Sequence, residues 1–281
     1  GPALALQAAS AALDAGDPAT ALALVPAATA DSARLALLAL PIRVRALALY
    51  GKPNEAGALV GAFAHLLLPV QRAALEQSVA YGWVRVGNLD RARAALDSAG
   101  PEADSSDAAG WLALYQGSLA GARAILRTST DASPELAEAL GVITRMRDDT
   151  APDVGAAFLA LARLDSAGAA EAFARAAAAH ADVASALWAV AGRIRSARRD
   201  TAGAAAIWAR IVHDYPASPE APGAELDWAR QLRHAGEAKA ALARLEHLIL
   251  TWPESALVPQ ARRELELARQ AIPGGGAGAV Q

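Results

Sequence analysis

Apolar residues recur along the chain at the spacing of amphipathic helices, in segments of about three to four turns that are divided by short turn signals. The turns carry Gly, Asp, Asn or Ser, which favour helix ends because they adopt the required backbone angles or cap exposed amide groups. Proline begins or separates several segments, as expected for a residue without an amide hydrogen. The pattern predicts seven helix pairs, at residues 3–29, 33–67, 69–99, 105–129, 152–180, 182–214 and 219–251.

Seven alanines mark these pairs at intervals of 35, 36, 30, 47, 35 and 37 residues, and a larger apolar residue follows each alanine after four positions. A small side chain lets two helices approach closely, while the larger neighbour fills the space beside it. Repetition with this period is typical of stacked helix pairs, so the sequence predicts an all-α solenoid of about seven pairs. The alanines are Ala21, Ala56, Ala92, Ala122, Ala169, Ala204 and Ala241.

The 47-residue interval between Ala122 and Ala169 is longer than the others by the length of a helix. We predict an extra helix near 134–147, either as an insertion that bends the array or as a divergent half-repeat. A last helix, Ser255 to Ala271, has a polar outer face that suits a terminal cap. The expected domains are an N-terminal array at 3–129, a connector at 130–151, a C-terminal array with its cap at 152–272, and a flexible Gly-rich tail at 273–281.

The composition excludes several classes of site. The 281 residues include no cysteine, which rules out disulfides, metal–thiolate sites and cysteine nucleophiles. The five histidines show no metal-binding spacing, and no phosphate-binding or nucleophile motif is present, so we expect no metal, no cofactor and no enzymatic activity. A formal net charge of -3 disfavours nucleic acid as a partner. No stretch approaches the roughly 18–20 apolar residues that a membrane span requires.

The last two predicted pairs carry the pattern of a known repeat family. In the last pair, the large, small, turn-glycine and proline positions of a repeat of about 34 residues are occupied by Trp228, Ala229, Leu232, Gly236, Ala241, Leu245 and Pro253. The preceding pair places Trp188, Gly192, Ala204, Trp208 and Pro216 at corresponding positions. These residues resemble the tetratricopeptide repeat family, most closely over residues 182–255, less over 69–127, and least in the first two pairs and at 130–165. The resemblance implies a non-enzymatic scaffold that binds other proteins.

The segment from Asp214 to Pro222 is similar to repeats of bacterial envelope proteins, namely the periplasmic tol-pal coordinator, the outer-membrane assembly lipoprotein and the helical domain of soluble lytic transglycosylases. This similarity implies a periplasmic or outer-membrane-associated location, and it is compatible with a signal peptide or lipid anchor upstream. Two alternatives stay open. One is the non-catalytic helical domain of a peptidoglycan-cleaving enzyme, and the other is a cytoplasmic regulatory adaptor.

The resemblance also implies which residues bind a partner, because the first helix of each tetratricopeptide pair lines an inner groove. The positions that point into this groove hold Tyr81, Arg85, Trp111, Tyr115, Phe158, Arg193, Arg230, Arg233 and His234. Aromatic side chains bury a large area and arginine binds carboxylates through two hydrogen bonds, so we expect an extended acidic segment or a C-terminal peptide as the ligand. In the alternative interpretation, Trp111 and Phe158 pack between neighbouring helices.

Overall fold

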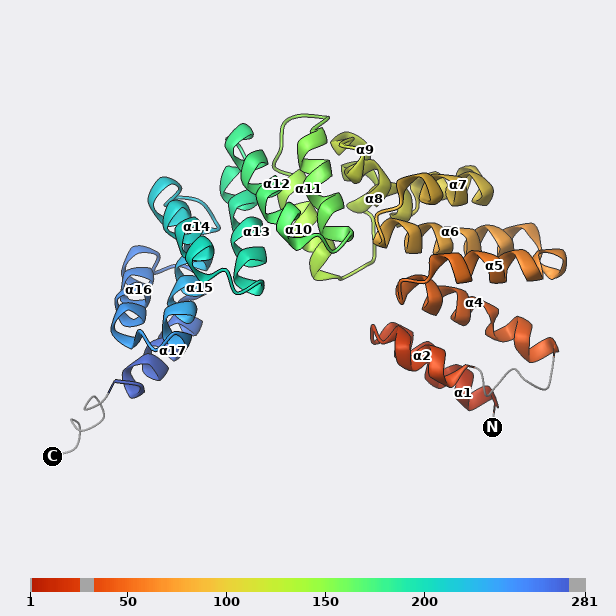
Figure 1. Ribbon diagram of the computed structural model, residues 1–281, viewed down its shortest axis with the longest axis horizontal. Coiled ribbons are helices and arrows are strands. Elements are labelled where there is room, and N and C mark those ends of the chain that lie inside the picture. Colours follow the sequence, from red (N-terminus) through yellow and green to blue (C-terminus); the bar gives the residue numbers. More distant parts are fainter. Residues whose placement is uncertain (1, 26–32, 273–281) are drawn as a thin grey trace. The chain divides into compact units, whose positions relative to one another are not determined.

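The computed structural model describes residues 2–25 and 33–272, and this part of the chain folds into α-helices joined by short turns, with no β-strand (Figure 1). The predicted all-α class is therefore confirmed. Contacts between Cα atoms group the helices into two compact units. The first unit is Gly1–Thr144 with Asp148–Asp165, and the second is Arg145–Arg147 with Ser166–Gln281.

Within the described residues, the first unit contains ten α-helices and two short 3-10 helices. They are α1 (Pro2–Asp14), α2 (Pro18–Leu24), α4 (Ala33–Leu49), α5 (Pro53–Phe63), η1 (Ala64–Leu66), α6 (Pro69–Arg85), α7 (Leu89–Ala99), η2 (Pro101–Ser105), α8 (Asp107–Tyr115), α9 (Leu119–Leu126), α10 (Pro134–Ile143) and α11 (Pro152–Ala162). Residues 26–29 of the first predicted pair and the predicted tail at 273–281 lie outside the described residues.

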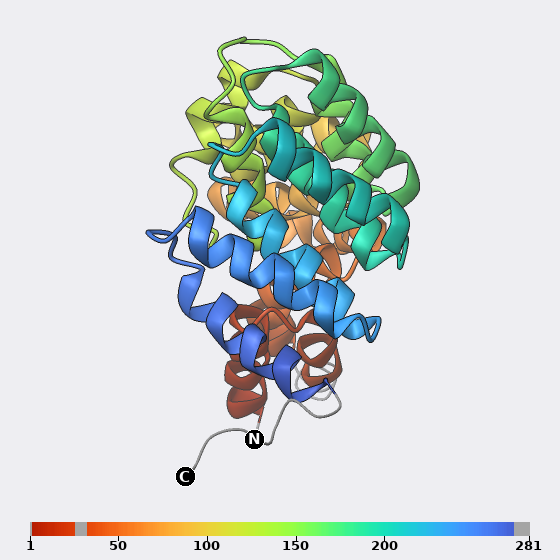
Figure 2. The same ribbon diagram turned by 90° about the vertical axis from the view of Figure 1, so that its left-hand side faces the viewer.

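The second unit contains six α-helices in its described part, and each packs on the next along the chain. They are α12 (Ser166–Ala179), α13 (Ala184–Ala197), α14 (Thr201–Asp214), α15 (Ala221–His234), α16 (Ala238–Thr251) and α17 (Val258–Gln270). Figure 2 shows them, from green to blue, as neighbouring helices in chain order.

The turns inside the helix pairs share one backbone conformation. Each has a residue with positive φ shortly after the first helix, and five of the seven are glycines, for which this conformation carries no steric cost. The other two are Leu164, with a φ of 60°, and Arg199, with a φ of 62°. All seven lie inside the predicted pairs, between the first and the second helix of each pair. The five glycines are Gly16, Gly51, Gly87, Gly117 and Gly236.

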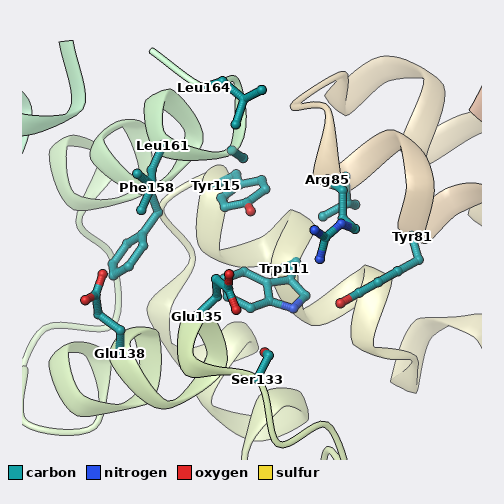
Figure 3. Close-up of a pocket in the computed structure, with 12 residues that line it drawn as sticks. Tyr81, Arg85, Trp111, Tyr115, Ser133, Glu135, Glu138, Phe158, Leu161 and Leu164 are labelled. Atoms are coloured by element: carbon teal, nitrogen blue, oxygen red, sulfur yellow. The ribbon is translucent and has the colours of Figure 1, made fainter. Parts of the chain in front are cut away.

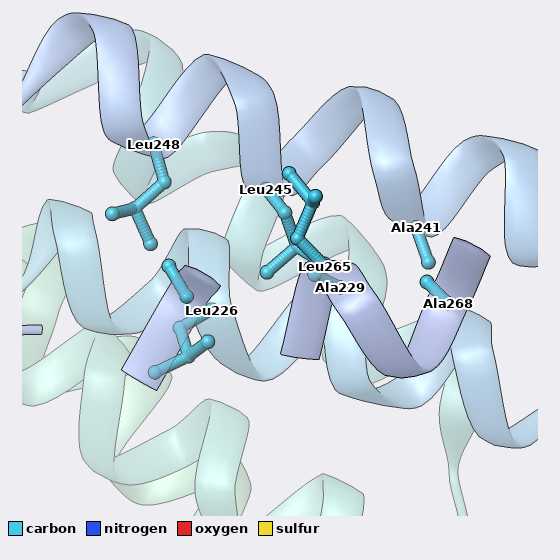
Figure 4. Close-up of a cluster of buried hydrophobic side chains, with 8 residues drawn as sticks. Leu226, Ala229, Ala241, Leu245, Leu248, Leu265 and Ala268 are labelled. Carbon is cyan, nitrogen blue, oxygen red and sulfur yellow. The ribbon is translucent and has the colours of Figure 1, made fainter. Parts of the chain in front are cut away.

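The seven repeated alanines are all fully buried, at 0% exposure, which confirms that they are sites of close helix contact. The larger residues that follow them are buried too, from Val25 at the first repeat to Leu245 at the last. In the second unit, Leu226, Leu245 and Leu265 bring α15, α16 and α17 into one apolar cluster (Figure 4). Burying a leucine contributes about 1.5–3 kcal/mol, so this cluster holds α17 in the terminal position expected of a cap.

The extra helix exists, but it is shorter than predicted. α10 ends at Ile143 instead of 147, and the next three residues belong to the second unit. There the Arg145 guanidinium lies 2.6 Å from Glu220 Oε1, and the Arg147 backbone N–H donates to Asp182 Oδ2 at 3.1 Å. These contacts join residues 145–147 to the second unit, directly after the end of α10.

The predicted pair at 152–180 is divided between the units, since α11 belongs to the first unit and α12 to the second. A glycine explains why α11 packs on α8. A Cβ atom at Gly155 would lie only 2.5 Å from the Leu114 carbonyl oxygen, so only glycine permits this approach. The Ala151 backbone N–H also donates to the Gly117 carbonyl at 2.9 Å. The compact units therefore divide after Asp165, whereas the sequence interpretation begins the second array at 152.

Candidate functional site

A pocket of about 280 Å³ opens in the first unit, between α6, α8, α10 and α11 (Figure 3). Five of the nine predicted partner-binding residues line it, although they come from three different helices. They are Tyr81 and Arg85 on α6, Trp111 and Tyr115 on α8, and Phe158 on α11. The structure thus brings these five together, and their role in binding stays a prediction.

The floor of the pocket is aromatic. Trp111 is 7% exposed and Phe158 is 3% exposed, so both pack in the core while one side of each faces the pocket. The ring centroids of Trp111 and Tyr115 lie 5.8 Å apart, with the rings tilted by 42°. Burial raises the pKa of the Tyr115 hydroxyl, and it raises that of Tyr81 as well, so both hydroxyls are neutral hydrogen-bonding groups at physiological pH. The two interpretations of Trp111 and Phe158 are therefore compatible.

Arg85 places a positive charge at one end of the pocket. Its guanidinium points between Tyr81 and Tyr115 (Figure 3), and its positive charge acts to lower the pKa of Tyr81 against the larger, raising effect of burial. No carboxylate among the described residues lies within 4.0 Å of it. Glu135 and Glu138 of α10 line the other end of the pocket, beside Trp111 and Phe158. The site is consequently bipolar, with an aromatic floor between a cation and two carboxylates.

A contact between distant segments holds the pocket walls in place. The Arg163 Nε–H at the end of α11 donates to the Gly87 carbonyl oxygen after α6 at 3.0 Å. Gly87 has a φ of 69°, and a Cβ atom there would lie 2.4 Å from Arg163 Cγ. Glycine therefore suits the turn, and a larger residue at this position would displace the Arg163 side chain.

A second pocket, of about 680 Å³, adjoins the first and shares Tyr81, Arg85 and Ser133 with it. Much of its lining is hydroxyl, amide or charged, and its residues come from the region of α1, α4, α6 and α8 and from the segment before α10. Arg45 and Asp14 form an ion pair of 3.3 Å at its far side. The two pockets together form one groove in the first unit, aromatic at one end and polar at the other. We call it the first-unit groove.

The other four predicted residues lie in the second unit. Arg230 Nε and Arg233 Nε both contact the Glu264 carboxylate of α17, at 2.9 and 3.0 Å. His234 is exposed, with Nε2 at 3.5 Å from an Arg233 nitrogen, and Arg193 is exposed on α13. Burial acts to raise the pKa of Glu264, but the two arginines outweigh it and hold the pKa below its usual value. Both arginines therefore stabilise the terminal helix.

Glu135 and Glu138 are missing from the sequence-based prediction. They lie on the extra helix, which has no equivalent in the repeat pattern, so the pattern assigned them no position. The sequence does place both carboxylates in the first turns of the predicted extra helix, directly after Pro134. Spacing alone does not show which face of that helix meets the groove.

In residues 2–25 and 33–272, no three His, Asp or Glu side chains are arranged to hold a metal ion. Nor is any helix of this part both long and apolar enough to cross a membrane.

No protein-family model matches the chain, and neither does any curated protein sequence. The helical fold and the first-unit groove are therefore the basis for a functional interpretation.

Proposed function

We propose that this protein is a non-enzymatic scaffold of tetratricopeptide-like helix pairs, arranged as a solenoid, that binds a peptide segment of a partner protein. The observation that carries the proposal is the first-unit groove, with its aromatic floor and with Arg85 lacking a carboxylate partner in the described structure. A guanidinium group that faces a pocket and has no carboxylate partner is available to a ligand.

The dimensions of the groove suit an extended peptide. The aromatic pocket of about 280 Å³ has room for one large side chain, and such anchors supply much of the affinity of peptide complexes. The adjoining polar pocket presents Gln77, whose side-chain amide is able to bond both the amide and the carbonyl groups of a peptide backbone. The Ser78 hydroxyl also lines it, but it donates to the Ala74 carbonyl and is left only as an acceptor.

The positions of the lining residues support the repeat assignment. α4, α6, α8 and α11 are the first helices of successive pairs, and all four contribute to the groove. Tetratricopeptide proteins place their first helices on the ligand-binding side, as the sequence resemblance implies.

Selection of binders from a random-peptide library, followed by affinity measurement, tests this function. We expect Arg85→Ala to weaken the selected peptides by about tenfold, equivalent to about 1.4 kcal/mol. Arg93→Ala is the matched control, because Arg93 is exposed on α7 and lines neither pocket. Bound peptide is also expected to slow amide hydrogen exchange in α6, α8 and α11. Failure to select any peptide, or equal affinity for both variants, contradicts the proposal.

We further propose a location in the bacterial cell envelope, supported by the likeness of residues 214–222 to repeats of envelope proteins. Fractionation of cells that express the complete gene tests it. Recovery from the periplasm or outer membrane is expected, and recovery from the cytoplasm favours the regulatory-adaptor alternative.

A further inference from the structure

We propose that the first-unit groove selects a basic peptide segment, with a Lys or Arg side chain in the aromatic pocket and its charged end at Glu135 and Glu138. This inference rests on the proposed peptide-binding function and names the chemistry of its ligand. It differs from the acidic ligand that the sequence suggests.

The balance of charge in the groove is negative. Its two pockets are lined by five carboxylates, Asp14, Asp107, Asp131, Glu135 and Glu138, but by only two guanidinium groups, Arg45 and Arg85. The ion pair between Arg45 and Asp14 cancels one charge of each sign, so carboxylates still outnumber guanidinium groups among the other lining residues. The complementary ligand is therefore a cation.

Several of the carboxylates hold only neutral partners. Asp107 accepts a hydrogen bond from the Ser129 hydroxyl at 2.8 Å, and Asp131 accepts one from the Ser133 hydroxyl at 2.8 Å. Glu135 is exposed at the edge of the pocket and forms no ion pair within the described part of the chain. These groups keep their negative charge available to a ligand.

The arrangement inside the aromatic pocket fits the shape of a basic side chain. Lys and Arg have an apolar stem and a charged end, and the pocket has an apolar floor with carboxylates at one side (Figure 3). Arg85 lies at the opposite end, which fixes the direction of the ligand by repelling its cation. Its guanidinium then faces the carbonyl groups of the bound backbone, to which it donates hydrogen bonds.

The chain itself shows the same pairing of aromatic rings with guanidinium groups. Arg91 lies over Trp83, Arg210 over Trp188 and Arg244 over Trp228, at 5.8, 4.6 and 4.0 Å from the ring centroids. Trp111 has no guanidinium within such a distance in the described structure, and it lines a pocket that also contains the Glu135 carboxylate. In the proposed complex, the basic side chain of the partner takes the place beside the Trp111 ring that an arginine of the chain takes at the other three tryptophans.

The test uses the peptides selected from the random library against the wild-type protein. We expect them to be enriched in Lys and Arg, and we expect replacement of their basic residues by Gln to weaken binding by about tenfold. Glu135→Lys is expected to weaken the same peptides by at least as much. Asp97→Lys is the matched control, because Asp97 is exposed on α7 and lines neither pocket.

Three results are decisive. Enrichment of acidic or uncharged peptides overturns the inference while leaving the proposed function in place. Equal binding to the wild type and to Glu135→Lys, with circular dichroism showing an intact helical fold, overturns it too. The absence of any selected peptide contradicts the proposed function itself.

Discussion

The two units use their arginines differently. In the second unit, Arg230 and Arg233 share Glu264, and Arg145 pairs with Glu220 at 2.6 Å. In the first unit, Arg85 faces a pocket without a carboxylate partner in the described structure. These arginines of the second unit therefore stabilise the packing of its own helices. In the first unit, the Arg85 guanidinium is available to a ligand in the groove.

This difference shows that the region with the most regular repeat pattern is not the region that contains the aromatic pocket. The resemblance to tetratricopeptide repeats is closest over residues 182–255, where large and charged side chains pack against neighbouring helices. The aromatic pocket lies beside the extra helix α10, which supplies the wall with Glu135 and Glu138. This helix, which the pattern of helix pairs does not include, thereby forms part of the concave surface of the first unit.

The largest expected effect comes from comparing two tryptophans. Trp208 is 2% exposed, and its ring lies so close to Gly192 that a Cβ atom there would approach to 2.4 Å. We expect Trp208→Ala to lower the free energy of unfolding by about 3–5 kcal/mol, since it leaves a cavity in a closed core. Trp111→Ala is expected to cost about 2 kcal/mol or less, because one side of that ring already borders a pocket.

Urea denaturation followed by circular dichroism measures both losses of stability, and hydrogen exchange in α8 and α14 assigns each loss to its unit. An equal loss of stability for Trp111→Ala and Trp208→Ala contradicts the interpretation that the Trp111 ring borders an open pocket.

The arginines give the next largest effect. Replacement of Arg230 and Arg233 by Ala is expected to cost about 1–2 kcal/mol of stability, because Glu264 loses two charged hydrogen-bond partners and is only 15% exposed. Arg85→Ala is expected to change stability by less than about 0.5 kcal/mol. Thermal or urea denaturation distinguishes the two cases, and a large loss for Arg85→Ala assigns that residue a structural role instead.

The local features of the fold were predictable from sequence, and the features that depend on distant contacts were not. The buried alanines and the turns are set by neighbours within a few residues, so period and turn chemistry reveal them. Five of the residues that the resemblance implied line the aromatic pocket, because the resemblance assigns a direction to each position of a helix. In contrast, the use of Arg230 and Arg233 depends on Glu264, about thirty residues away, and spacing does not show that this carboxylate faces inward.

Glu225 differs from Glu264 in the second unit, because its pKa is raised and not lowered. This carboxylate is fully buried, and only one of its oxygens has a partner, from His247 at 2.7 Å and Arg244 at 3.6 Å. Burial raises the pKa of Glu225 above its usual value of 4.5, although His247 and Arg244 act to lower it. The folded state then binds the proton more tightly than the unfolded state does, so stability falls as pH rises from 4.5 through the raised pKa.

Measurement of unfolding free energy across a pH series checks this sign. We expect Glu225→Gln to flatten the decline above pH 4.5. Glu264 has the opposite sign, because its lowered pKa gives stability that is present above 4.5 and lost as pH falls through the folded value. Glu264→Gln is expected to remove that loss at low pH. Equal slopes for the wild type and Glu225→Gln contradict the assignment.

The smallest expected effect tests the two turns that lack glycine, one in each unit. Arg199 is exposed in the left-handed region with a φ of 62°, where five equivalent turns have glycine. We expect Arg199→Gly to stabilise the protein by about 0.5 kcal/mol, since relief of the backbone cost of about 1–2 kcal/mol exceeds the entropy that glycine adds to the unfolded chain. Arg198→Gly is the control and is expected to destabilise, because Arg198 has a φ of -80° and gains no such relief.

Leu164→Gly is expected to relieve the same strain in the first unit, but it also removes an apolar side chain from the edge of the aromatic pocket. Affinity for the selected peptides should therefore fall for Leu164→Gly and stay unchanged for Arg199→Gly, and equal affinity for both variants places the binding site outside this pocket.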